Sequence, residues 1–123
     1  MEIIIDQEQA RVPVTIIRLS DRINLGNTDQ LEQAAREAFN AGARYLLIDL
    51  TDVISMTSAG LRTLQVIYKL FEHKDGTSVK VGGKSAHLKL LNPNVELRRV
   101  LELVGFEAYL DIYDDEQTAL NAF

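Results

Sequence analysis

Apolar and polar residues follow two different periods along this chain, and the change of period separates strands from helices. The run Tyr-Leu-Leu-Ile-Asp-Leu at residues 45–50 is almost wholly apolar, which is typical of a strand buried on both faces. From residue 58 onward, apolar residues recur every three or four positions, as on one side of a helix. They are Leu61, Leu64, Ile67, Tyr68 and Phe71, with Val66 and Leu70 widening the apolar side. We therefore expect a central strand followed directly by a central helix.

A second helix is predicted before the central strand. Asn27 with Gln30 three residues later forms a capping-box-like start, and Gly42 is placed to end the helix. Between them one apolar stripe contains Leu31, Ala34, Ala35, Ala38 and Phe39. Residues 12–20 read as a strand before this helix, so strand, helix and strand should form a right-handed parallel crossover.

Residues 2–6 read as another strand, which the polar turn 7–10 joins to the strand at 12–20. Pro13 cannot donate a hydrogen bond to a ladder and belongs at a strand start or on an edge. Residues 21–26 then form a connection at one end of the sheet. Two strands thus precede the first helix.

The pattern after the central helix leaves an alternative open. Breaker clusters at 74–77 and 82–85 flank residues 78–81, so either 78–81 or 86–91 is the next strand, and we favour 86–91. The segment 73–85 then becomes a long loop. A helix at 94–104 ended by Gly105, a strand at 108–113 and a last helix opened by Asp114 with Gln117 follow. This alternation predicts an α/β fold with a mixed, mostly parallel sheet of about five strands and helices packed on it.

Composition narrows the class of protein. A chain of 123 residues that is 46% hydrophobic fits one domain, residues 1–123, with one core. It contains no Cys, no export signal and no apolar run long enough for a membrane span, so we expect a soluble, cytoplasmic protein. The net charge of −5 argues against a nucleic-acid surface. The adjacent pair Arg98-Arg99 is interpreted as part of a solvated helix face.

Motifs for catalysis are weak. The run Gly82-Gly83-Lys84-Ser85 lacks the upstream glycine of a phosphate loop. His73 and His87 have no ligand-like spacing and are expected at the surface or the rim of the molecule. A phospho-aspartate receiver needs an acidic pair near the first strand end, which Asp6 with Glu8 serves poorly. We interpret Asp49 as the end of the buried strand and Asp52 as a turn residue. The expectation is a protein that is not an enzyme and uses no cofactor or metal.

The predicted start of the central helix contains two hydroxyl side chains. Thr57 or Ser58 stands where the helix begins, and either hydroxyl could cap free N–H groups of the first turn. The positive end of the helix dipole also favours an anion there, including a phosphate on a hydroxyl. Gly60, one turn into a helix, indicates a close backbone contact with some neighbour.

The residues Leu47-Ile48-Asp49-Leu50 followed by Met56-Thr57-Ser58-Ala59-Gly60-Leu61 resemble the core signature of STAS domains. This family includes bacterial anti-sigma factor antagonists and the cytoplasmic tails of sulfate transporters, and its signature usually reads Asp-Leu, a short gap, then Met-Asp-Ser-Ser/Ala-Gly-Leu. The resemblance covers nearly the whole chain and supports residues 86–91 as the next strand. It also implies that the 21–26 loop lies beside a phosphorylatable serine.

The resemblance implies a bacterial antagonist that regulates transcription by partner switching. Such a protein would bind an anti-sigma factor serine kinase, be phosphorylated at Ser58 or alternatively Thr57, and be restored by a serine phosphatase. Neither nucleic acid nor membrane would be a partner, and a monomer or weak homodimer is expected. The partner-binding residues would be Asp21, Asn24, Thr57, Ser58, Ala59, Gly60 and Arg62.

Two departures from the signature favour an alternative. Thr57 replaces the Asp that usually precedes the serine, and Asn24 stands where the family often has Asp in the neighbouring loop. Both changes remove a carboxylate that kinase docking or positioning of the serine could require. The second hypothesis is therefore a STAS scaffold or sensory module that is never phosphorylated.

Overall fold

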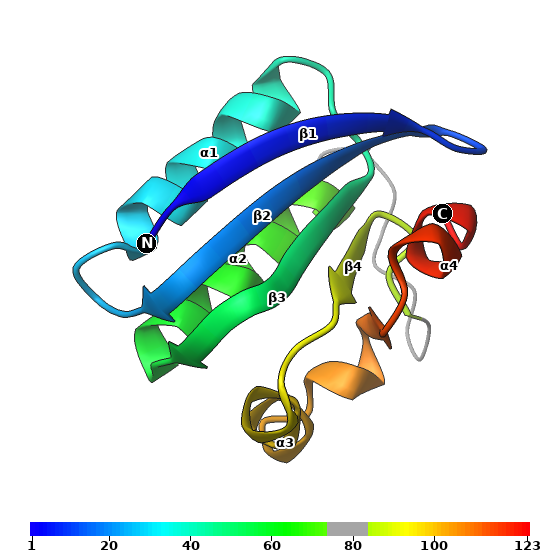
Figure 1. Ribbon diagram of the computed structural model, residues 1–123. Coiled ribbons are helices and arrows are strands. Elements are labelled where there is room, and N and C mark those ends of the chain that lie inside the picture. The colour runs from blue at the N-terminus through cyan, green and yellow to red at the C-terminus, as the bar shows by residue number, and fades with distance from the viewer. Residues whose placement is uncertain (74–83) are drawn as a thin grey trace.

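The computed structural model describes residues 1–73 and 84–123, which form a twisted sheet with helices on its faces (Figure 1). Within these residues there are five strands and four α-helices. The strands are β1 (Ile3–Gln9), β2 (Pro13–Ile23), β3 (Leu46–Met56), β4 (Leu88–Leu91) and β5 (Asp111–Tyr113). The helices are α1 (Thr28–Asn40), α2 (Ser58–His73), α3 (Val95–Leu103) and α4 (Glu116–Asn121), with a 3₁₀ turn at Phe106–Ala108.

The sheet runs in the order β1-β2-β3-β4-β5. The strands β1 and β2 pair antiparallel, and every later neighbour pair is parallel. The predicted α/β fold with a mixed, mostly parallel sheet is confirmed. Because β2 to β5 run the same way, their carboxyl ends share one edge of the sheet, and the loops that follow them meet there.

One face of the sheet is covered by α1 and α2, which lie behind it in Figure 1. Ile17 and Leu19 of β2 and Ile48 and Leu50 of β3 point into this layer and are at most 2% exposed. Leu64 of α2 is fully buried among them. The central position predicted for the 58–71 helix is thus confirmed, and the core lies between this helix and β3.

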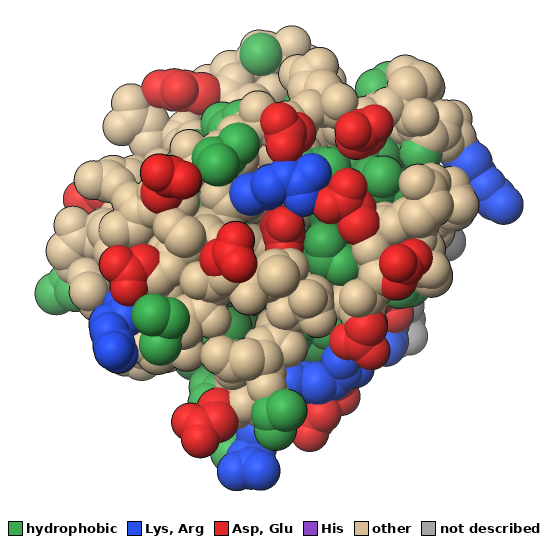
Figure 2. All heavy atoms as spheres, in the orientation of Figure 1, with side chains coloured by type: hydrophobic (Ala, Val, Ile, Leu, Met, Phe, Trp, Pro, Cys, Tyr) green, Lys and Arg blue, Asp and Glu red, His purple; other side chains and the backbone are tan. Residues whose placement is uncertain are grey.

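The opposite face is covered only in part, by α4. Ala119 and Leu120 of α4 form a small cluster with four sheet residues, Val14, Ile16, Leu47 and Leu91. No other element of the described chain covers the rest of this face, over β1 to β3, and Figure 2 shows acidic side chains gathered on it. The domain therefore has one thick apolar layer and one thin one.

The strand ends differ from the sequence expectation. β3 continues past Leu50 to Met56, and β2 continues past Ser20 to Ile23, because the two strands pair along this whole length. Two register shifts interrupt the pairing, and Asp21 adopts a positive φ of 69° within it. Asp52 was expected in a turn, but it lies on β3 opposite Ser20. The turn interpretation was wrong because a strand with one solvated face carries polar residues.

One end of α1 agrees with the prediction and the other does not. Gly42 adopts a positive φ of 111°, and the N–H groups of Gly42 and Ala43 donate to the carbonyls of Phe39 and Ala38, so the predicted stop is confirmed. The side chain of Asn27 makes no capping bond to the helix, although Asn27 is the N-cap residue. The predicted capping box is therefore wrong.

The C-terminal elements are close to the prediction. β4 confirms the choice of 86–91, whereas the alternative strand at 78–81 lies outside the described residues, as does most of the 73–85 loop. Asn94 caps α3 by accepting from the N–H of Leu97 at 2.8 Å. The last strand is shorter than predicted because Phe106–Ala108 form the 3₁₀ turn. Asp115, one residue after the predicted Asp114, caps α4, and its bonds from Thr118 lower the pKa of its carboxyl.

Candidate functional site

The candidate site lies at the edge of the sheet where β2 and β3 end and α2 begins. Ile23 pairs with Met56, and the N–H of Thr57 donates to the carbonyl of Ile23 at 3.0 Å. This bond sets the loop after β2 directly beside the first turn of α2, as Figure 1 shows at the left of the molecule. The expected proximity of the 21–26 connection and Ser58 thus follows from strand pairing.

The helix α2 begins at Ser58, and the carbonyl of Thr57 accepts the N–H of Leu61 at 3.1 Å. Thr57 is accordingly the N-cap residue and Ser58 the first helical residue. Both residues are exposed, and within residues 1–73 and 84–123 neither hydroxyl has a hydrogen-bond partner. A hydroxyl in this position can accept a phosphoryl group, since it is accessible and the helix dipole favours the added negative charge.

Gly60 is buried, and its close neighbours belong to the same chain. A Cβ atom at this position would lie 2.4 Å from Cγ of Met56 and 3.0 Å from Cγ2 of Ile23. The absence of a side chain therefore lets the first turn of α2 pack onto the ends of β2 and β3. The predicted close contact exists, but it is internal to the domain. Gly60 therefore allows the close packing beneath the site and adds no exposed surface to it.

The loop after β2 holds its own shape through asparagine side chains. The N–H of Asn24 donates to Oδ1 of Asn27 at 2.9 Å, and Oδ1 of Asn24 accepts from the N–H of Gly26 at 2.9 Å. Nδ2 of Asn27 donates to the carbonyl of Arg22 at 2.8 Å. Asn24 therefore has a structural role that its side chain performs without a carboxylate.

Exposed apolar side chains surround this edge. Leu25 in the loop is 80% exposed, Ile54 near the end of β3 is 53% exposed, and Val95 at the start of α3 is 75% exposed. Asn94 donates to the carbonyls of Val53 and Ile54, which fastens the start of α3 beside the end of β3. Sequence periodicity did not single out these three residues, because each stands alone outside an amphipathic stripe.

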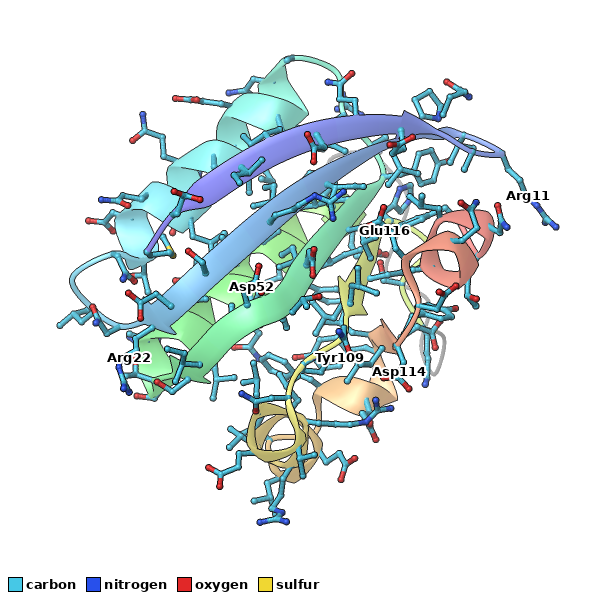
Figure 3. The ribbon with its side chains drawn as sticks, viewed as in Figure 1. Arg11, Arg22, Asp52, Tyr109, Asp114 and Glu116 are labelled. Atoms are coloured by element: carbon cyan, nitrogen blue, oxygen red, sulfur yellow. The ribbon has the colours of Figure 1, made fainter. Side chains whose placement is uncertain are left out.

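Exposed cations complete the rim. Arg22 lies at the end of β2 and points to solvent (Figure 3), and Arg62 lies one turn after Ser58 on α2. In the part of the chain that the structure describes, neither arginine forms an ion pair. Asp21 is exposed beside them, and Ala59 is half-buried. The predicted partner-binding residues other than Gly60 therefore reach the surface at this edge.

A second cluster of charges lies on the open face of the sheet. The guanidinium of Arg18 contacts Asp6 on β1 at 2.7 Å, Asp49 on β3 at 2.9 Å and Glu116 on α4 at 2.6 Å. The hydrogen bonds to Glu116 and Asp6 raise the pKa of Arg18 above its ordinary value. Asp49 also accepts from the N–H and hydroxyl of Thr51, so it lies within β3 and does not end it. The cluster fastens β1 and α4 to the sheet.

Histidine and glycine motifs add nothing to either cluster. Nδ1 of His87 lies 2.8 Å from the carbonyl oxygen of Arg44, and its ring stacks on Tyr45 with centroids 5.2 Å apart. His87 is half-buried at the rim of the molecule, while the side chain of His73 and residues 82 and 83 of the 82–85 run lie outside the described residues. No helix in the described ranges is both long enough and apolar enough to cross a membrane.

The order of strands, the antiparallel first pair and the helix that follows β3 define a SpoIIAA-like α/β domain. The chain belongs to the STAS domain family, whose model matches residues 5–119. The resemblance found in the residues around Ser58 is thereby confirmed over nearly the full length.

Solved structures give the same result. An anti-sigma factor antagonist from Mycobacterium paratuberculosis is 25% identical with a TM-score of 0.74, and the match covers 98% of this chain and 93% of that one. The protein TM1081 from Thermotoga maritima is 25% identical with a TM-score of 0.72, covering 86% and 83%. The antagonist SpoIIAA in its unphosphorylated form is 17% identical with a TM-score of 0.71, covering 96% and 94%, which shows the shared fold alone. No curated protein matches the chain.

Proposed function

We propose that the chain is an anti-sigma factor antagonist that acts by partner switching. In its unphosphorylated form it binds an anti-sigma factor with serine-kinase activity and so frees the sigma factor. Phosphorylation at Ser58, with Thr57 as the alternative acceptor, ends this binding, and a serine phosphatase restores it. The observation that carries the proposal is the Ser58 hydroxyl at the start of α2, which is exposed and has no hydrogen-bond partner among the described residues.

The surroundings of Ser58 fit a protein interface. Three exposed apolar side chains, Leu25, Ile54 and Val95, lie at the same edge of the sheet. Removing such apolar area from water favours binding by about 25 cal/mol per Å² before the entropic costs of association, and the exposed Arg62 adds a charge that can select the partner. Asp21, Asn24, Thr57 and Ala59 complete the proposed surface.

Phosphorylation would then act on the complex rather than on the fold. A phosphate adds about −1.5 to −2 charges, and at the N-terminus of α2 the helix dipole stabilises them. Within an interface made for a neutral hydroxyl, the same charges must be desolvated beside apolar side chains. The complex therefore weakens while the domain stays folded. The proposal includes a protein of the bacterial cytoplasm that acts as a monomer or weak homodimer.

A second candidate function is a STAS scaffold or sensory module that is never phosphorylated. Thr57 in place of the usual Asp, and Asn24 in place of a loop Asp, favour it because both remove carboxylates near the acceptor. Incubation with the cognate kinase and ATP, followed by mapping of the modified residue, separates the two functions. Phosphate on Ser58 or Thr57 supports the first, and none on either supports the second.

The binding test uses Ser58→Asp with two controls. We expect a folded Ser58→Asp protein that binds the anti-sigma partner at least tenfold more weakly, a loss of about 1.4 kcal/mol. Ser58→Ala should bind like wild type and keep its free energy of unfolding within about 0.5 kcal/mol, because in residues 1–73 and 84–123 the hydroxyl has no hydrogen bond to lose. Gln117→Glu, at an exposed position of α4, makes the same charge change far from the site.

Titration calorimetry with circular dichroism measures both quantities. If wild type and a well-folded Ser58→Asp protein bind the partner with equal affinity, the phosphorylation switch is ruled out and the scaffold function is favoured. A loss of affinity in Gln117→Glu as large as in Ser58→Asp would show that the net charge, not the site, controls binding.

A further inference from the structure

The strand β1 forms one edge of the sheet and has no neighbour on its outer side among the described residues. Its seven residues, Ile-Ile-Ile-Asp-Gln-Glu-Gln, include no proline and no lysine. Edge strands in stable proteins are usually protected by such residues, because a row of unpaired N–H and C=O groups can add another strand. Figure 1 shows β1 running along this edge with α1 behind it.

A groove of about 580 Å³ lies between β1 and α1. Ile5 and Gln7 of β1 form one side, and the small side chains of Ala34 and Ala38 on α1 and of its C-cap residue Ala41 form the other. Ile5 is 48% exposed at this groove. The groove therefore offers apolar surface next to the open backbone edge, in the place where alternate side chains of an added strand would point.

The two faces of β1 differ in chemistry. Asp6 and Glu8 lie opposite Ile16 and Val14, whose side chains belong to the α4 face of the sheet. Residues 5 and 7 point the other way, into the groove. In an added strand, every second side chain would lie on the face of the carboxylates. The side chains between them would lie on the face of the apolar groove.

The charges near this edge are predominantly acidic. Asp6 shares Arg18 with two other carboxylates, while Glu8 forms no ion pair within residues 1–73 and 84–123. Within residues 1–73 and 84–123, the carboxylate of Glu37 on the groove wall accepts from the neutral amide of Gln33 and forms no ion pair. Arg44, which also lines the groove, lies 3.9 Å from the ring centre of Phe39 and donates to the carbonyls of Phe39 and Ala43.

A second copy of the chain does not fit this edge. Two copies could pair their β1 strands antiparallel, with the same face of each sheet on the same side. If most of the strand is paired, residue 5, 6 or 7 of one copy then lies opposite the same residue of the other. These registers set Glu2 opposite Glu8, Asp6 opposite Asp6, or Asp6 opposite Glu8. Like charges directly opposite each other destabilise a pair of strands, so the carboxylates act against self-association.

We infer that the outer edge of β1 and the adjoining groove bind an extended basic segment of a partner protein, which adds a strand to the sheet. Lys or Arg side chains of the segment face Asp6 and Glu8, and its alternate apolar side chains enter the groove beside Ile5. Main-chain hydrogen bonds supply affinity, and the alternation of basic and apolar residues supplies specificity.

This docking surface is separate from the Ser58 site. The groove includes residues 41–45, just before β3, whereas Ser58 follows the end of β3. A strand of 11 residues at about 3.3 Å each holds the groove roughly 30 Å from Ser58. The groove and the Ser58 site are therefore distinct, and failure of either interaction leaves the other testable.

The test uses a defined peptide and the full chain. The probe is Lys-Val-Lys-Val-Lys-Val-Lys with blocked ends, titrated into the ¹⁵N-labelled protein. We expect a Kd below about 1 mM, with amide shifts along 3–9 and 34–41 and slowed hydrogen exchange in β1. A comparison peptide of the same composition, Lys-Lys-Lys-Lys-Val-Val-Val, should bind at least fivefold more weakly, because it lacks the alternation.

Two matched pairs of variants locate the contact. Glu8→Lys should weaken the probe at least fivefold, while Glu96→Lys, the same charge change on exposed α3, should weaken it less than twofold. Ala41→Trp, which fills the groove, should also weaken it at least fivefold. Ala122→Trp is its control, since Ala122 is likewise the exposed C-cap residue of a helix.

Four results would overturn the inference. The first is no shift in β1 with 1 mM probe, and the second is equal binding of the two peptides, which would reduce the effect to net charge. The third is equal weakening by Glu8→Lys and Glu96→Lys. The fourth is dimerisation of the free chain that Glu8→Lys changes, which would make a second copy the occupant.

Discussion

Gly60 is the residue whose size matters most for the candidate site. It lies where the first turn of α2 meets the ends of β2 and β3, and a Cβ atom there would overlap Cγ of Met56. The position of Ser58, two residues earlier, depends on this close packing. A residue that adds no surface to the interface therefore decides how the interface is presented.

We expect Gly60→Ala to destabilise the domain by about 1–3 kcal/mol. The overlap with Met56 and Ile23 forces the helix outward, and this cost exceeds the gain of at most about 1 kcal/mol from replacing Gly by Ala in a helix. Chemical denaturation measures the difference.

The double variant Met56→Ala with Gly60→Ala provides the control. Removing the Met56 side chain beyond Cβ gives the new methyl group room, so the second substitution should then cost little. Stabilisation by Gly60→Ala alone would show that α2 can shift without cost and that packing does not require the glycine.

At the scale of elements, α4 depends on few contacts. It is a helix of six residues that places Ala119 and Leu120 on the sheet. A helix this short is marginal by itself, so tertiary contacts must hold it in place. Glu116 supplies one of them, because it begins α4 and pairs with Arg18, which is only 27% exposed (Figure 3).

We expect Arg18→Met to destabilise the domain by about 1–3 kcal/mol. The substitution leaves Asp6, Asp49 and Glu116 close together without their cation, and Asp49 is only 12% exposed. Arg36→Met on α1 is the control, because its pair with Glu32 is exposed on both sides and should contribute about 0–1 kcal/mol. Equal effects of the two substitutions on thermal unfolding would contradict a special role for Arg18.

The elements were predictable where their residues are periodic and less so where pairing decides. The apolar stripe of α1 and the buried run of β3 follow from sequence alone. The extension of β3 to Met56 does not, because residues 51–55 gain their strand conformation from β2. The predicted capping by Asn27 was also wrong, because its side chain forms hydrogen bonds within the preceding loop.

At the scale of the whole molecule, the sequence predicts the topology better than the surface. The fold and the position of Ser58 follow from the order of patterns and from the signature around it. The Arg18 cluster and the exposed Leu25, Ile54 and Val95 do not, because they join residues from distant parts of the chain. Only the folded chain brings such residues to one face.

We expect Leu64→Ala to destabilise the whole domain by about 2–5 kcal/mol. Leu64 is fully buried in the layer between α2 and the sheet, and a small domain has a margin of only about 5–15 kcal/mol. Leu103→Ala, at a position 79% exposed, should change the midpoint of thermal unfolding little. A small effect of Leu64→Ala would mean that α2 is not central to the core.

The Arg18 cluster also has a consequence for the order of folding events. The three carboxylates lie 12, 31 and 98 residues from Arg18 along the chain, so the last pair forms only after nearly the whole chain has been gathered. Contacts of such high sequence separation close large loops, so the pair with Glu116 carries a high entropic cost during folding. We expect this pair to form late, so that Arg18→Met speeds unfolding more than it slows folding. The guanidinium of Arg18 would then set the lifetime of the folded chain rather than the speed at which it is reached.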